Sequence, residues 1–299
     1  MKKTKALAWR IQVTNATVID MKTFSPLINI EELLVLSKKN KILLMDARVG
    51  ADVKNTYLEQ HLEGALHVDL NTDLANIKSD AANGGRHPLP KLDEFSMLLG
   101  NLGIKKTTHI VVYDDKNASN AAARFWWMLK AIGHKKIQVL NGGFQAAITN
   151  GFPTNNGKEI LKKTTAYPAK NWQPHIVDLE DVEKAVQNPL FTVIDVRDAA
   201  RYRGEKEPID LIAGHIPGAI NVPFTENLDE KGFFLPKEIL KLKYEKVIEN
   251  QKVIVHCGSG VTACHTILAM VYAGFEMPKL YVGSWSEWSR NGKEIATNL

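Results

Sequence analysis

The chain has 299 residues, which is long for a single hydrophobic core and sufficient for two domains. Its two cysteines permit one disulfide at most, so a disulfide scaffold is excluded and a reducing, cytoplasmic environment is expected. The net charge of +5 comes from scattered lysines rather than from a basic helix with aromatic side chains, and no apolar run has the length of a membrane span. Neither nucleic-acid binding nor membrane insertion is therefore predicted.

The first residues, Met1-Lys-Lys-Thr-Lys5, resemble the start of a signal peptide. Polar side chains at Arg10, Gln12 and Asn15 interrupt the apolar stretch after them, and no small-residue cleavage site is present. We expect a poorly ordered leader here, and Met21 is an alternative start of translation.

The first half of the chain contains an ordered series of predicted elements. An apolar strand ending in Asp-x-Arg lies at 41–48, a His-x-x-Gly-Ala segment at 61–68 and a second apolar strand at 109–114. A helical stretch then ends at Gly133, as helices often do at glycine.

The second half repeats this order, with corresponding segments at 191–197, 215–222 and 252–257 and a helical stretch that ends at Gly274. Such self-similarity indicates an internal duplication. Short apolar strands separated by helices are typical of parallel strands that are buried on both faces. The predicted fold class is therefore α/β, with two tandem domains that each contain a parallel sheet flanked by helices.

The domain limits are set by the position of the connector. The stretch between the halves is rich in Pro, Asn, Gly and Lys, which is typical of a linker. We predict an N-terminal domain over residues 25–155 and a C-terminal domain over residues 172–292.

The most informative segment is the turn that begins at Cys257, between an apolar strand and a helical pattern. In a strand–turn–helix of this kind the backbone N–H groups of the turn surround the first side chain, and the helix N-terminus adds partial positive charge. This environment suits a thiolate nucleophile or a persulfide anion. The candidate site consists of Cys257, Gly258, Ser259, Gly260, Val261, Thr262 and Ala263.

The other cysteine and the first half provide comparisons. Cys264 falls on the apolar face of the helix and is predicted to be core. The first half has Asp114 or Asp115 at the position of Cys257, and its turn contains neither glycine nor thiol. We expect one half to carry the chemistry and the other to complete a cleft between the domains.

These motifs resemble the tandem-domain rhodanese family, closest to its 3-mercaptopyruvate sulfurtransferase branch, over about residues 25–292. The segment Tyr57-x-x-x-His61-Leu-Glu-Gly64-Ala is similar to the first-domain signature, and Gly283-Ser-Trp-Ser-Glu-Trp288 to the C-terminal one. Thiosulfate-type members typically carry cationic side chains at or beside the positions of Gly258 and Ser259. Their absence favours a carbonyl-bearing donor.

The resemblance implies a reaction in two halves without cofactor or metal. The Cys257 thiolate takes sulfur from 3-mercaptopyruvate as a persulfide, pyruvate leaves, and a thiol acceptor such as thioredoxin, or cyanide, removes the sulfur. Two alternatives stay open: a thiosulfate sulfurtransferase, and a non-enzymatic persulfide carrier or redox module.

The resemblance also implies roles for residues outside the turn. Arg201 matches an arginine that holds the donor carboxylate, a task that suits a planar guanidinium. The family's second such arginine is missing, and Arg203 and Lys206 are the candidate substitutes. Ser259 is expected to relay a proton beside His87, and Asp69 matches an acidic residue that we assign to substrate binding.

A phosphatase with this fold is disfavoured. Such an enzyme needs an arginine six residues after the cysteine to hold phosphate oxygens, and that position is Ala263. The paired residues that recur in both halves are predicted to have scaffold roles, because one half lacks the nucleophile. They are Asp46, Arg48, His61, Asp195, Arg197 and His215.

Overall fold

The structure is a computed structural model that describes residues 24–39, 42–160, 163–172, 175–248 and 252–297. The leader and the alternative start at Met21 lie outside the described residues. No helix within the described ranges is long and apolar enough to cross a membrane.

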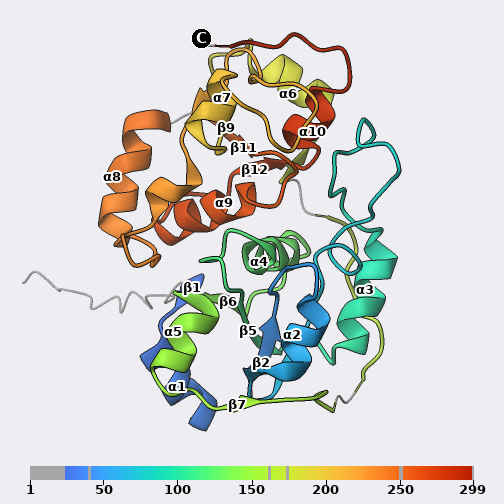
Figure 1. Ribbon diagram of the computed structural model, residues 1–299, viewed down its shortest axis with the longest axis vertical. Coiled ribbons are helices and arrows are strands. Elements are labelled where there is room, and N and C mark those ends of the chain that lie inside the picture. The colour runs from blue at the N-terminus through green and yellow to red at the C-terminus, as the bar shows by residue number, and fades with distance from the viewer. Residues whose placement is uncertain (1–23, 40–41, 161–162, 173–174, 249–251, 298–299) are drawn as a thin grey trace, which may run out of the picture.

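The first half forms a five-stranded sheet in which all the paired strands are parallel (Figure 1). In spatial order its strands are β1 (Leu27–Ile28), β6 (Ile137–Leu140), β5 (His109–Tyr113), β2 (Ile42–Asp46) and β4 (Ala65–His67). Its helices are α1 (Ile30–Lys39), α2 (Val53–Glu59), α3 (Leu92–Asn101), α4 (Ala121–Ala131) and α5 (Gly143–Thr149). A short antiparallel pair joins β3 (His61–Leu62) to β7 (Thr154–Asn155).

The second half forms another five-stranded parallel sheet. In spatial order its strands are β8 (Ile176–Val177), β12 (Lys279–Tyr281), β11 (Lys252–His256), β9 (Phe191–Asp195) and β10 (Ile220–Asn221). Its helices are α6 (Leu179–Ala185), α7 (Ala199–Arg203), the 3-10 helix η1 (Phe224–Asn227), α8 (Lys237–Ile248), α9 (Ala263–Tyr272) and α10 (Ser284–Trp288). Taken in chain order, corresponding strands occupy the same places in both sheets, so the predicted fold class and duplication are confirmed. The domain limits at 25–155 and 172–292 stay predictions.

The strand registers identify the first-half counterpart of Cys257. Asp46 in β2 pairs with Tyr113 at the end of β5, and Asp195 in β9 pairs with His256 at the end of β11. The next residue in the first half is Asp114 and in the second half Cys257. Of the two residues that the sequence leaves open, Asp114 is therefore the equivalent one.

Each central strand ends in a buried ion pair that ties it to a neighbouring loop. Arg48 donates to the Asp46 carboxylate with Nη2–Oδ2 at 2.7 Å, and the same nitrogen lies 2.6 Å from the Gln60 carbonyl oxygen. The second copy repeats the arrangement, with Arg197 Nη2 lying 2.6 Å from Asp195 Oδ2. These contacts agree with a scaffold role, because they occur equally in the half that lacks a thiol.

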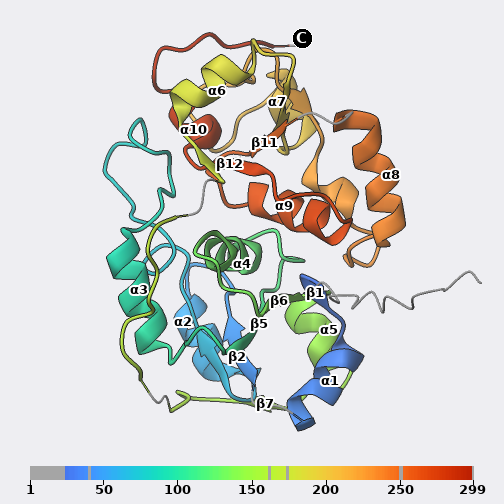
Figure 2. The same ribbon diagram turned by 180° about the vertical axis from the view of Figure 1, so that it is seen from behind.

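The two domains are joined through α4 and α9, which lie next to each other between the sheets (Figures 1 and 2). One hydrophobic cluster includes Phe125, Trp126 and Trp127 of α4 together with Ile267 and Leu268 of α9. Because large apolar side chains from both halves share this core, their burial holds the domains in contact.

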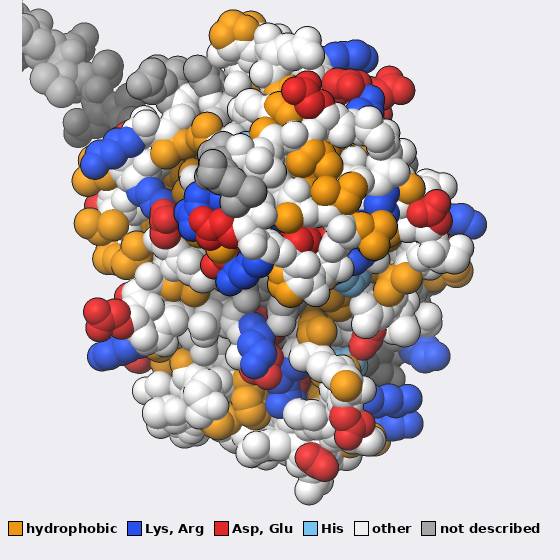
Figure 3. Space-filling model, turned by 45° about the horizontal axis from the view of Figure 1, so that its top comes forward, with side chains coloured by type: hydrophobic (Ala, Val, Ile, Leu, Met, Phe, Trp, Pro, Cys, Tyr) orange, Lys and Arg blue, Asp and Glu red, His pale blue; other side chains and the backbone are white. Residues whose placement is uncertain are grey.

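On the face seen in Figure 3, acidic and basic side chains are interspersed.

Candidate active site

The turn after β11 holds its carbonyl groups on one side and leaves its N–H groups available. The Cys257 and Gly258 carbonyl oxygens accept from the N–H groups of Trp285 and Ser286 at 3.0 and 2.9 Å, and the Cys257 N–H donates to Ser284 Oγ at 3.2 Å. Among the described residues, no acceptor is bound by the N–H groups of residues 258–263. Buried N–H groups normally have partners, so these N–H groups of residues 258–263, here called the cradle, are available to an anion bound at the turn.

Gly260 gives the cradle its shape. Its φ is +73°, in the left-handed region that residues with a Cβ rarely adopt. A Cβ at this position would also lie 2.4 Å from the Val282 carbonyl oxygen. Only glycine fits both constraints, so the backbone of the turn can lie directly against the end of β12.

The first domain contains the same cradle, filled by its own side chain. The buried Asp114 carboxylate accepts from the N–H groups of Lys116 and Ala118, both at 2.9 Å, and of Ala122 at 3.3 Å. Asn117, at the same offset as Gly260, also has a positive φ, of 55°. Burial raises the pKa of Asp114 to about 6. The first half therefore shows this turn donating backbone N–H groups to a carboxylate, and the turn after Cys257 repeats its left-handed residue at the same offset.

A histidine from the first domain reaches the turn. His87 Nδ1 lies 2.9 Å from Ser259 Oγ, so the structure brings together the two residues predicted to relay a proton. Burial, followed by the charges of Arg86 and Arg124, lowers the pKa of His87 to about 4. The imidazole is therefore neutral at neutral pH and able to exchange a proton with the Ser259 hydroxyl.

The segment around His87 is held on α10. The Gly84 N–H donates to Glu287 Oε1 at 2.8 Å, and the Arg86 N–H donates to Ser286 Oγ at 3.0 Å. Since Ser286 also binds the Gly258 carbonyl, α10 connects this first-domain segment directly to the Cys257 turn.

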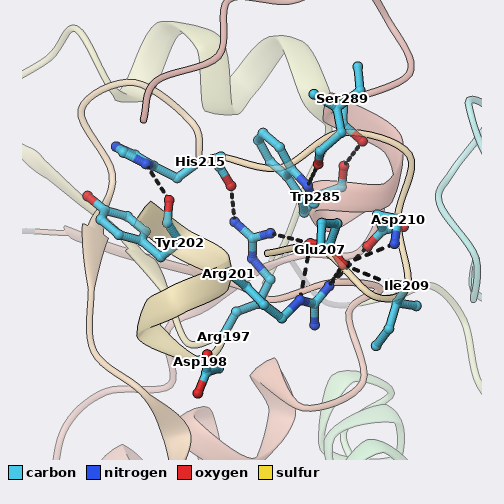
Figure 4. Close-up of polar contacts among 12 residues, drawn as sticks. Arg197, Asp198, Arg201, Tyr202, Glu207, Ile209, Asp210, His215, Trp285 and Ser289 are labelled. Carbon is cyan, nitrogen blue, oxygen red and sulfur yellow. Dashed lines mark hydrogen bonds and ion pairs between the residues drawn. The ribbon is translucent and has the colours of Figure 1, made fainter. Parts of the chain in front are cut away.

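Arg201 belongs to a buried network of charges beside the turn (Figure 4). It donates from Nε and Nη2 to the Glu207 carboxylate at 3.1 and 2.7 Å, and Nη2 lies 3.3 Å from Asp210 Oδ2. Glu207 also lies 3.3 Å from Arg197 Nη1. The network keeps the Arg201 guanidinium in a defined orientation.

Arg86 is a site residue that the sequence alone did not reveal. Its Nε lies 3.1 Å from Asp210 Oδ1 across the domain boundary. A methyl group on Gly258 would lie 2.9 Å from Arg86 Nη2 and 3.5 Å from Arg201 Nη2, so both guanidinium groups lie against the first glycine of the turn. The sequence signal was only the cation next to His87.

Arg124 of α4 lies behind the turn and is fully buried. It donates to the Gly260 carbonyl oxygen at 3.0 Å and to the His87 carbonyl oxygen at 3.1 Å. Burial lowers the pKa of Arg124, and the groups that oppose this shift are the thiols of Cys264 and Cys257. Arg124 thus connects the His87 segment of the first domain to the back of the Cys257 turn.

Cys264 occupies the predicted core position. It is 0% exposed, and its Sγ lies 3.4 Å from the Gly260 carbonyl oxygen. Burial raises the pKa of this thiol to about 12, so at neutral pH it is protonated and not a nucleophile.

Three predicted residues are not brought to the turn by their contacts. The Asp69 carboxylate accepts from the N–H groups of Asn71 and Thr72 in its own turn and lines a separate cavity of about 330 Å³ in the first domain. Arg203 pairs with Glu205 and Lys206 with Asp198, all as exposed side chains. A substrate-binding role for Asp69 stays a prediction without support from these contacts.

Comparison with known proteins places the chain in a family. The model of the rhodanese-like domain matches residues 29–149 and 178–291. A probable 3-mercaptopyruvate sulfurtransferase of Pseudomonas aeruginosa is 38% identical over 86% of this chain and 89% of its own length. A thiosulfate sulfurtransferase of Rattus norvegicus is 35% identical over 79% and 80%. The structure of a 3-mercaptopyruvate sulfurtransferase from Leishmania major covers 88% of this chain, with 74% of its own length matched, at 28% identity and a TM-score of 0.77.

The chain therefore belongs to the rhodanese family and carries its domain in two tandem copies. Within the described residues, no three His, Cys, Asp or Glu side chains form a group that could hold a metal ion.

Proposed function

We propose that the protein is a sulfurtransferase that moves a sulfur atom from 3-mercaptopyruvate through a persulfide on Cys257 to a thiol or to cyanide. The observation that carries the proposal is the turn after Cys257, whose N–H groups bind no acceptor within the described part of the chain. Two guanidinium groups lie against its first glycine. The relatives that match most of the chain include enzymes named for this reaction.

In the first half-reaction, the Cys257 thiolate attacks the sulfur of the donor. The S–S bond forms as the C–S bond breaks, and the carbon takes up the donor's thiol proton to become the methyl group of pyruvate. Ser259 and the neutral His87, 2.9 Å apart, relay that proton. The persulfide keeps its negative charge within the cradle, which binds an anion before and after transfer.

In the second half-reaction, an acceptor thiolate or cyanide attacks the outer sulfur and the Cys257 thiolate leaves. For the physiological acceptor we propose a dithiol protein such as thioredoxin, in the cytoplasm. Both cysteines of the chain are free thiols, which suits a reducing compartment.

The donor is selected by its carboxylate. Arg201 and Arg86 lie against the turn and come from different domains. Together they supply a pair of guanidinium groups, of which the sequence predicted only that of Arg201. The turn itself has no cationic side chain between Gly258 and Ala263. Positive charge is therefore concentrated where a carboxylate would sit, beside the sulfur-transfer position rather than in it.

Thiosulfate is the second candidate donor, because the same cluster of arginines can attract a dianion and a thiosulfate sulfurtransferase is among the relatives. The two are separated by kcat/KM for each donor with cyanide as acceptor, measured through pyruvate and thiocyanate. We expect a higher kcat/KM for 3-mercaptopyruvate. A higher value for thiosulfate would overturn the donor assignment, and no turnover with either would leave only the non-enzymatic carrier.

A further inference from the structure

Asp210 is buried in a segment whose neighbours are exposed. Its residue is 7% exposed, whereas Ile209 and Leu211 on either side are 54% and 76% exposed. Burying a carboxylate while leaving two aliphatic side chains in solvent is unfavourable unless the carboxylate binds charged partners. The segment is therefore arranged around the contacts of Asp210.

These contacts are three arginines from three parts of the chain. Asp210 Oδ1 lies 3.1 Å from Arg86 Nε and 3.2 Å from Arg290 Nη1, and Oδ2 lies 3.3 Å from Arg201 Nη2. A methyl group on Gly258 would lie 3.6 Å from Asp210 Oδ2. An internal carboxylate thus already occupies guanidinium groups at the edge of the Cys257 turn.

The charges of the network can be counted. Its cations are Arg86, Arg197, Arg201 and Arg290, and its anions are Asp195, Glu207 and Asp210, which gives four positive and three negative charges. The formal net charge of these residues is +1. One carboxylate of a donor neutralises this charge, whereas a dianion adds one negative charge more than is needed. Without the charge of Asp210 the net value would be +2, which matches a dianion.

We propose that Asp210 determines the charge selectivity of the donor site: its carboxylate leaves one positive charge for the donor, so the site takes a monoanionic 2-oxo acid thiol in preference to dianionic thiosulfate. This inference rests on the proposed function, since it concerns the donor of the same half-reaction. Like charges that lie close together in a buried site repel each other strongly, and the Asp210 carboxylate repels the second negative charge of thiosulfate.

The arginines do not depend on Asp210 alone for their positions. Arg201 donates twice to Glu207, at 3.1 and 2.7 Å, and Arg290 Nη1 donates to the Ser286 carbonyl oxygen at 2.8 Å. The backbone N–H of Arg86 is held by Ser286 Oγ. Neutralising Asp210 therefore leaves the guanidinium groups of Arg201 and Arg290, and the backbone of Arg86, with other partners. The effect of its charge can thus be separated from an effect on folding.

The kinetic test uses Asp210→Asn, which keeps the size of the side chain and removes its charge. The ratio of kcat/KM for thiosulfate to that for 3-mercaptopyruvate should rise about tenfold. In Asp210→Glu, which keeps the charge, this ratio should stay within about twofold of the wild-type ratio. The same is expected for Glu205→Gln, which removes an exposed charge from the same segment. An unchanged or lower ratio in Asp210→Asn would overturn the proposal, as would an equal rise in Glu205→Gln.

A second readout needs no sulfur donor. Iodoacetate is an anion and iodoacetamide is neutral, and both alkylate a thiolate with loss of iodide. The iodoacetate-to-iodoacetamide ratio of alkylation rates at Cys257 should rise in Asp210→Asn and stay constant in Glu205→Gln. If the wild type failed to use 3-mercaptopyruvate, the proposed function would fall, but this ratio would still decide the role of Asp210. An unchanged ratio in Asp210→Asn would show that its charge does not govern anion access.

Discussion

Asp114 and Cys257 occupy one position in two copies of the same turn, and their side chains account for the different roles of the two domains. The Asp114 carboxylate uses the N–H groups of its own turn, whereas the N–H groups after Cys257 have no acceptor among the described residues. A thiolate or persulfide at Cys257 meets the same surroundings as the carboxylate. The proposed nucleophile thus lies at a turn that the fold forms twice.

At the same scale, Arg86 should bind the donor carboxylate in the role for which the sequence offered Arg203 and Lys206 as candidate substitutes. Arg86→Ala is expected to lower kcat/KM for 3-mercaptopyruvate by about 30-fold, the equivalent of about 2 kcal/mol, because one partner of a largely buried charge contact is lost. Arg203→Ala is the matched control, since Arg203 pairs with Glu205 as an exposed side chain. Steady-state kinetics of both variants test this prediction. An equal loss of kcat/KM in the two would mean that the donor carboxylate is not bound by Arg86.

Among the elements, the turn between β11 and α9 depends on α10 and on the end of β12. The carbonyls of Cys257 and Gly258 bind N–H groups of α10, and Gly260 lies against the Val282 carbonyl. The sequence predicted this strand–turn–helix, because hydrophobic periodicity and glycine are local signals. The sequence did not predict the cluster of Arg86, Asp210 and Arg290. Asp210 and Arg290 meet through the fold of the second domain, and Arg86 joins them only when the two domains pack together.

Gly260→Ala tests the close approach, with Gly274→Ala as control. Both glycines have positive φ, +73° and +94°, but a Cβ at Gly274 would meet nothing within 4 Å. We expect Gly274→Ala to cost about 1 kcal/mol of unfolding free energy and Gly260→Ala about 3 kcal/mol, because the latter adds a steric conflict with backbone. Urea unfolding gives both values, and similar losses would mean that the turn is free to move away from β12.

For the molecule as a whole, the repeated order of elements was sufficient to predict two parallel sheets, since each half repeats the same pattern. The hydrophobic core that the two domains share was harder to predict from the sequence. The structure places Phe125, Trp126 and Trp127 between the sheets, in a cluster that includes side chains of both halves. Through α4, the half without a thiol also brings Arg124 to the carbonyl of Gly260.

Stability should fall in mild acid. Burial lowers the pKa of seven histidines: His87, His109, His134, His175, His215, His256 and His265. The pKa values for His87 and His265 are about 4 and about 3, against the usual 6.5. The unfolded chain therefore binds protons at a higher pH than the native one, so their stabilisation is complete above pH 6.5 and is lost as the pH falls toward 4.

Thermal melts between pH 7.5 and 4.5 measure this effect, and we expect the Tm to drop by several degrees or more. Asp73 and Asp114 act in the opposite direction, since burial raises the pKa of both, that of Asp114 to about 6, but they are two groups against seven. His87→Gln should reduce the drop. A constant Tm over this range would mean that the buried histidines do not resist protonation in the folded chain.

Sulfur transfer by this protein should depend on Cys257 alone as the carrier between donor and acceptor. The direct measurement is peptide mass spectrometry of the full chain after brief exposure to 3-mercaptopyruvate without acceptor. We expect one added sulfur atom on Cys257, its removal by cyanide, and no persulfide in Cys257→Ser, whereas Cys264→Ser should still be loaded. Sulfur on Cys264, or turnover in Cys257→Ser, would show that the cradle after β11 is not where the sulfur is carried.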